Sequence, residues 1–143
     1  MVDALKKIHG LLQSEGRLVD IHPATRPPPV TIRSATRTAP VGLLQEHGDF
    51  VDYELAEAAL RDVVDAGLFR WESKGGFDQC VVADSPEDLF THLETKWKRA
   101  IVDADLQRAI ERDWPHAEPG SELVISQPVC IWTLRPIAFE MDL

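Results

Sequence analysis

Residues 2–23, VDALKKIHGLLQSEGRLVDIHP, contain a helix pattern, a turn and a strand pattern in direct succession. Apolar residues recur at steps of three and four, which predicts an amphipathic helix over 2–13: Val2, Leu5, Ile8 and Leu11. Gly16 follows, where a glycine of positive φ commonly ends a helix. The apolar run over 17–22 then predicts a buried strand, and Pro23 stops it because proline has no amide for a sheet. Helix, turn and strand together form half of an α/β crossover unit.

The same stretch carries a family resemblance. Its part LLQSEGRLVDIHP, residues 11–23, resembles the RVLKPGGRLLDI-P segment of class I S-adenosylmethionine-dependent methyltransferases. In that family the segment is the helix before the fifth strand of a seven-stranded sheet, and it usually has proline and two glycines where this chain has Ser14-Glu15-Gly16. Further along, AALRDVVDAGLF, residues 58–69, resembles the helix that leads into the family's sixth strand. The resemblance covers nearly all of this chain but only the C-terminal half of the family's fold.

The predicted fold class is therefore α/β, a partial Rossmann-like methyltransferase sheet that is mixed and has about five strands. Alternation and turn residues predict these strands: 17–22, 68–73, 77–83, 122–126 and 129–135. Gly75-Gly76 is predicted to turn the chain between the second and third, and Gln127-Pro128 between the last two. Helices 2–13 and 52–66 are predicted to cover both faces of the sheet, with 86–99 and 103–113 as an added pair. Ser85 and Pro86 mark the start of the first of that pair.

Crossover handedness makes strands 17–22 and 68–73 parallel, joined by helix 52–66. The resemblance implies that strand 129–135 lies antiparallel between them. Residues 24–50 have no comparable regularity: three prolines at 27–29 give a stiff extended connector. Short strands are predicted there at 30–33, 36–38 and 41–44.

Composition limits the possible functions. A chain of 143 residues suits one domain over 1–143. A formal net charge of −9 argues against nucleic acid and anionic membranes as partners. No apolar run approaches the roughly 18 residues that cross a bilayer, and the N-terminus lacks the features of a signal peptide. We therefore expect a cytoplasmic protein whose two cysteines, Cys80 and Cys130, are reduced and buried.

No glycine loop of the Gly-x-Gly-x-x-Gly or Gly-x-Gly-x-Gly kind is present, and the only adjacent glycines are Gly75 and Gly76. The family's nucleoside cofactor needs such a loop after the first strand and an acidic residue at the end of the second. Both would lie upstream of residue 1. The chain alone is thus expected to bind no cofactor, and S-adenosylmethionine only if a partner completes the site.

Candidate catalytic residues lie at the carboxyl end of the first predicted strand, where open α/β sheets place ligands: Asp20, His22 and Arg26. Asp20 and His22 project to one side and could form an acid/base pair. The competing interpretation makes His22 a surface or capping residue at a strand exit, and it is the favoured one. The five histidines are dispersed, without metal-ligand spacing, so no metal site is predicted.

Three functional hypotheses remain. The chain is a methyltransferase-like protein without transferase activity, or an independent dimeric binding module; these two together are favoured. The alternative is one subunit of a split methyltransferase that acts on a small molecule, completed by a partner chain that carries the glycine loop. An unpaired edge on strand 17–22 and an uncovered apolar face on helix 2–13 predict a homodimer through residues 2–23. Residues 24–44 could instead fold back as a covering strand.

Overall fold

The computed structural model describes residues 1–48 and 50–139, and within them the chain forms two compact units. Unit 1 comprises Met1–Thr25, Val51–Phe77 and the chain from Val129 onward; unit 2 comprises Arg26–Phe50 and Asp78–Pro128. Each unit has its own hydrophobic core. Strands β5 and β7 contribute residues to both units, so the prediction of a single domain over residues 1–143 stays a prediction. No helix in the described ranges is long and apolar enough to cross a membrane.

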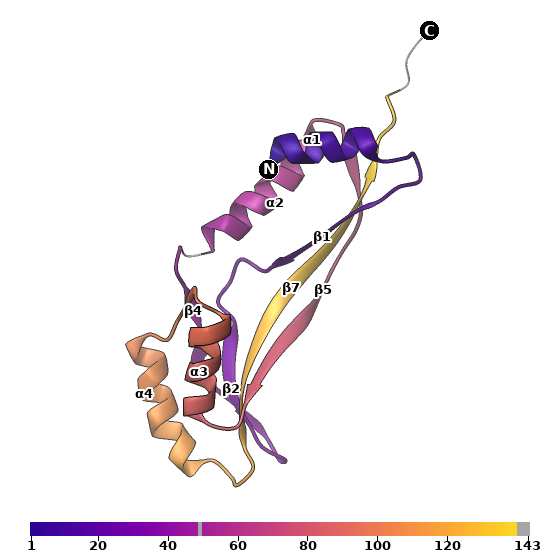
Figure 1. The fold of residues 1–143 in the computed structure, drawn as a ribbon. Helices are drawn as coiled ribbons and strands as arrows, with labels where there is room; N and C mark the ends of the chain where they lie inside the picture. The colour runs from indigo at the N-terminus through magenta and orange to yellow at the C-terminus, as the bar shows by residue number, and fades with distance from the viewer. Residues whose placement is uncertain (49, 140–143) are drawn as a thin grey trace. The chain divides into compact units, whose positions relative to one another are not determined.

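Unit 1 is built from two helices and three strands (Figure 1). In chain order these are α1 (Val2–Leu11), β1 (Leu18–Pro23), α2 (Val51–Asp65) and the relevant parts of β5 (Phe69–Ala83) and β7 (Glu122–Pro136). β7 pairs antiparallel with β1, from Leu18 opposite Leu134 to Pro23 opposite Val129. β5 pairs with β7 as well. The order in unit 1 is therefore β1–β7–β5, which confirms the prediction that the closing strand lies antiparallel beside the first strand in the same sheet.

Both helices of unit 1 pack on one face of this sheet. α1 and α2 contact each other, and their side chains share one buried cluster with Trp132 and Leu134, which alternate onto a single face of β7. The prediction that helices 2–13 and 52–66 cover both faces is thus wrong. The predicted uncovered face of the first helix is wrong for most of its length, because Leu5 is buried and Val2 and Ile8 pack against the cluster, whereas Leu11 is 84% exposed. The opposite face of the sheet keeps large apolar side chains exposed.

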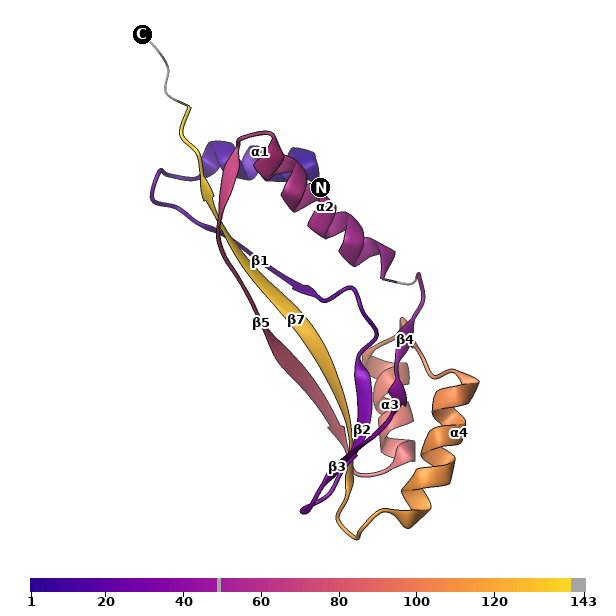
Figure 2. The ribbon, with the colours of Figure 1, turned by 180° about the vertical axis from the view of Figure 1, so that it is seen from behind.

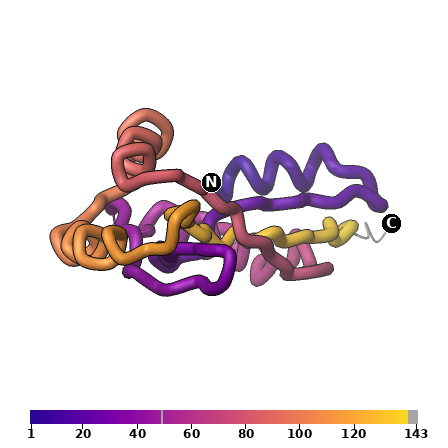
Figure 3. The backbone as a smooth tube through the Cα atoms, turned by 90° about the horizontal axis from the view of Figure 1, so that it is seen from below, coloured from indigo at the N-terminus to yellow at the C-terminus, as the bar shows by residue number. Residues whose placement is uncertain are grey.

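The turn between α1 and β1 differs from the predicted glycine cap. α1 ends at Leu11, and the chain then reverses so that β1 runs back beside the helix (Figure 3). Gly16 does not have a positive φ. A Cβ atom there would lie 3.0 Å from the carbonyl oxygen of Gln13 and 3.0 Å from a side-chain carbon of Leu12. Close backbone approach, and not a left-handed conformation, therefore explains the glycine at this position.

Neither predicted hairpin forms. Gly75 and Gly76 lie inside β5, and a Cβ on Gly76 would be 2.7 Å from the carbonyl oxygen of Val129, so this glycine allows β7 to approach closely. Pro128 lies inside β7, between the residues that pair with β2 (Pro29–Arg33) and those that pair with β1. Residues 126–128 have no partner in either of these two ladders, so the missing proline amide interrupts neither.

Unit 2 packs two helices on a small antiparallel sheet (Figure 2). The sheet contains β3 (Thr38–Leu43), β2, the first part of β7 and the last part of β5. β4 (Gln45–Glu46) pairs separately with β6 (Ala100–Ile101). The predicted helix pair is confirmed as α3 (Pro86–Lys96) and α4 (Ala104–Asp113), followed by the 3₁₀ turn η1 (Trp114–His116). Ser85 caps α3, as predicted, by accepting a hydrogen bond from the amide of Asp88.

The outcome for residues 24–44 is mixed. A strand is present at β2, close to the predicted 30–33, but it pairs with β7 and β3. The alternative in which this segment covers the edge of the first strand is therefore wrong. The prediction that both cysteines are buried is wrong: Cys80 is exposed and Cys130 is half-buried, and both are free thiols.

An ion-pair cluster spans the three strands of unit 1. Glu72 accepts hydrogen bonds from the Nε atoms of Arg17, at 2.7 Å, and Arg135, at 2.6 Å. These bonds lower the pKa of Glu72 from 4.5 to about 2. The carboxylate is thus stabilised in the folded chain. Its contribution to stability is fully present above pH 4.5 and is lost as the pH falls toward 2.

We therefore expect Glu72→Gln to lower the melting temperature at neutral pH, and this difference from the wild-type chain to shrink as the pH falls from 4.5 toward 2. Thermal unfolding followed by circular dichroism across that range measures it. Glu94→Gln, at an exposed position on α3, is the control and should give a small difference at every pH. A Glu72→Gln difference that persists unchanged at pH 2 would contradict the assignment.

Candidate functional site

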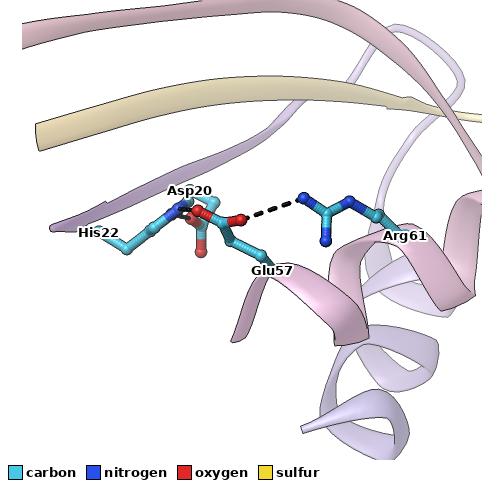
Figure 4. Close-up of polar contacts among 4 residues, drawn as sticks. All are labelled: Asp20, His22, Glu57 and Arg61. Atoms are coloured by element: carbon cyan, nitrogen blue, oxygen red, sulfur yellow. Dashed lines mark hydrogen bonds and ion pairs between the residues drawn. The ribbon is translucent and has the colours of Figure 1, made fainter. Parts of the chain in front are cut away.

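The imidazole of His22 in unit 1 makes polar contacts through both of its ring nitrogens. Its Nδ1 contacts the carboxylate of Asp20, and its Nε2 lies 3.1 Å from Oε1 of Glu57. The other oxygen of Glu57, Oε2, accepts a hydrogen bond of 3.1 Å from Arg61. Figure 4 shows Asp20 and His22 from β1 meeting Glu57 and Arg61 from α2. The four residues form a continuous chain of polar contacts between a strand and a helix.

Local structure explains why these residues meet. Asp20 and His22 are two apart on β1, so both point to the face that carries the helices. Glu57 and Arg61 are four apart on α2 and form an i,i+4 pair. The side chain of His22 is only 7% exposed and that of Glu57 13%. A charge network at this depth fixes the position of α2 on β1 more strongly than surface pairs do, because the interior screens charges less.

Two further residues of β7 complete the surroundings of His22. Cys130 lies directly opposite His22 in the β1–β7 ladder. Trp132 meets the imidazole edge to face, with ring centroids 4.7 Å apart. The nitrogen of His22, a carboxylate oxygen of Glu57 and the sulfur of Cys130 lie within 4.8 Å of one another. This group therefore has a nitrogen, an oxygen and a sulfur donor around one point.

Acid/base catalysis by His22 does not fit this geometry. A general base needs one ring nitrogen within hydrogen-bond reach of a substrate proton. Here both nitrogens of His22 contact carboxylates, and the ring is buried. The arrangement favours a role in holding the unit together over a role in catalysis.

The structure unites only two of the three residues that the sequence suggested. Asp20 and His22 are in contact, whereas Arg26 is an exposed residue of unit 2 and is not part of this group in unit 1. Glu57, Arg61 and Cys130 were not predicted. The spacing of Glu57 and Arg61 on a predicted helix was a usable signal for an ion pair, although not for its partner on the sheet.

Two of the cavities that the described residues of unit 2 line differ in their chemistry. One, of about 510 Å³, is lined mainly by apolar residues of α3 and the segment after it, including Phe90, Leu93 and Trp97. The other, of about 410 Å³, brings Arg37, His116 and Glu118 to its walls. Glu118 already accepts a hydrogen bond from Thr36. Neither cavity combines a nucleophile with a base in hydrogen-bond contact, so neither supports a specific reaction.

Comparisons of the chain with protein-family models, with curated proteins and with solved structures found no match.

Proposed function

We propose that the chain is a non-catalytic binding or structural module that forms a homodimer through the sheet face of unit 1 opposite the helices. This open face consists of Val19 and Ile21 on β1, Phe77 on β5, and Ile131 and Thr133 on β7. Val19 lies opposite Thr133 and Ile21 opposite Ile131, so each pair shares a face. A Cβ on Gly75 would lie 3.7 Å from Ile131, and Phe77 follows two residues later on the same strand.

The observation that carries the proposal is the exposure of large apolar side chains on this face. Val19 is 51% exposed, Ile21 60% and Phe77 51%, although all three lie in strands of a sheet whose other face is a packed core. Contiguous apolar patches of this kind mark interaction surfaces. Two such sheets can pack face to face about 10 Å apart, with their side chains interdigitating.

The charges at the end of the open face are compatible with a second copy as the occupant. The chain carries a formal net charge of −9, so two copies repel each other through most of their surfaces. The end of the open face holds two arginines and two glutamates in one ion-pair cluster, which has no net charge: Arg17, Arg135, Glu15 and Glu72. A face with an apolar centre and an ion-pair cluster of no net charge at its end is one through which a strongly acidic chain can associate with itself.

We expect the purified chain to have a mass twice its 16.0 kDa in light scattering, and Ile21→Glu to be monomeric. A glutamate there places a charge in the centre of the apolar contact, where desolvation is costly. Leu55→Glu is the matched control, because Leu55 is an equally exposed apolar residue on α2. It should remain dimeric. A monomeric wild-type chain, or a dimer that survives Ile21→Glu, would rule out this interface.

The alternative is a subunit of a split S-adenosylmethionine-dependent methyltransferase acting on a small molecule. The order β1–β7–β5, with its central antiparallel strand, supports it, because the resemblance implies that order. Within the described residues β1 also pairs on one side only. This alternative requires that a chain with a glycine loop pairs with β1 and creates affinity for S-adenosylmethionine. Calorimetric titration with S-adenosylmethionine separates the two when a chain that carries the glycine loop is added: binding that appears only with that chain supports the alternative, no binding with it supports the homodimer, and saturable binding by the isolated chain fits neither.

A further inference from the structure

We propose that His22, Glu57 and Cys130 bind one divalent cation of the zinc class in unit 1. The proposal rests on two independent features of the group. The first is the donor set, because the ring nitrogen, the carboxylate oxygen and the sulfur lie within 4.8 Å of one another. Tetrahedral zinc sites separate their ligand atoms by roughly 3.3 to 3.7 Å, as metal–ligand distances of about 2.0 to 2.3 Å require. A small side-chain adjustment closes the group around an ion.

The second feature is the pair of contacts made by the atoms of His22 and Glu57 that face away from the proposed ion. Asp20 contacts Nδ1 of His22, which leaves Nε2 as the nitrogen that faces Glu57. Arg61 contacts Oε2 of Glu57, which leaves Oε1 as the oxygen that faces His22. A carboxylate on the far nitrogen of a histidine is the usual support of a metal-bound imidazole, since it fixes the ring orientation and raises its basicity.

Donor chemistry selects the cation. Zinc accepts histidine nitrogen, carboxylate oxygen and thiolate sulfur together, whereas calcium and magnesium require oxygen ligands. When the cation binds, it takes the place of the proton on Nε2 and of the thiol proton on Cys130, and both protons pass to solvent. Three protein ligands leave a fourth position for water. The backbone supports the arrangement, because His22 and Cys130 are direct cross-strand neighbours and α2 brings Glu57 onto the same face.

Cobalt(II) tests the proposal because it replaces zinc and absorbs visible light in tetrahedral sites with thiolate ligands. We expect the wild-type chain to bind one equivalent of cobalt, with a thiolate-to-cobalt charge-transfer band that added zinc removes. Cys130→Ser should lose the band. Cys80→Ser, at the chain's other cysteine, should keep it. Asp20→Asn should keep the band and weaken binding by about 10- to 100-fold, the range for loss of a supporting carboxylate.

A second measurement needs no substitution. Zinc should slow alkylation of Cys130 by iodoacetamide in the wild-type chain, read by mass spectrometry, and leave alkylation of the exposed Cys80 unchanged. Absence of the band in the wild-type chain, its loss in Cys80→Ser with retention in Cys130→Ser, or equal alkylation of Cys130 with and without zinc would overturn the proposal.

Discussion

Replacing His22 with alanine is expected to lower the free energy of unfolding by about 3 kcal/mol, because it leaves two carboxylates facing each other without the imidazole between them. Breaking a buried ion pair by removing one partner typically costs about 3 to 5 kcal/mol. The lower end applies here for two reasons. The side chain of Asp20 is 26% exposed, so its charge is not fully desolvated. Glu57 retains its contact with Arg61 after His22 is removed. Denaturant unfolding followed by circular dichroism measures the change.

Two controls make this result specific. His47→Ala changes an exposed histidine of unit 2 and should alter stability by less than about 0.5 kcal/mol. Adding Asp20→Asn to His22→Ala removes one of the uncompensated charges, so the double variant should be more stable than His22→Ala alone. A cost for His22→Ala no larger than that for His47→Ala would contradict the role of the network in holding α2 on β1.

Local sequence signals predicted the start of α3 but not the end of α1. Ser85 and Pro86 start α3 as expected, whereas Gly16 has no positive φ. The cap of α3 works as a signal because it depends on neighbours in the chain. The antiparallel contact of the closing strand with the first strand was also predicted, although its source was a family resemblance and not the residue pattern.

Non-local features were predicted less well. Gly75-Gly76 and Gln127-Pro128 have turn-forming composition, yet each lies within a 15-residue strand. The neighbouring strands determine the conformation of both segments. β7 approaches Gly76 closely, and Pro128 lies between the part of β7 that pairs with β2 and the part that pairs with β1. Composition cannot reveal a partner strand, so both segments were predicted as hairpins.

The candidate site divides in the same way into residues that the local sequence predicted and residues that it did not. Asp20 and His22 are two residues apart on one strand, and alternation alone places them together. Glu57 requires knowledge of which face of α2 meets β1, and Cys130 requires the register of β1 on β7. Neither the face of α2 nor the register of β1 on β7 can be read from a single sequence. A register shift of one residue would move Cys130 to the open face.

Phe69→Ala is expected to cost about 3 to 5 kcal/mol, the usual range for truncating a fully buried phenylalanine. Phe69 is the first residue of β5 and is completely buried in the cluster of unit 1, where its ring also meets His9 edge to face at 5.2 Å. Alanine leaves a cavity between two helices and the sheet that the helices cannot both close, since α1 and α2 already contact each other.

Phe77→Ala on the same strand provides the matched control, because Phe77 lies on the open face and is half exposed. Both changes are best made in the Ile21→Glu background, so that dimerisation does not contribute to the measured stability. There Phe77→Ala should cost less than about 0.5 kcal/mol, while Phe69→Ala keeps its full effect. Equal costs at the two positions would mean that both faces of the sheet are packed, and the open face could then not serve as the contact between two copies.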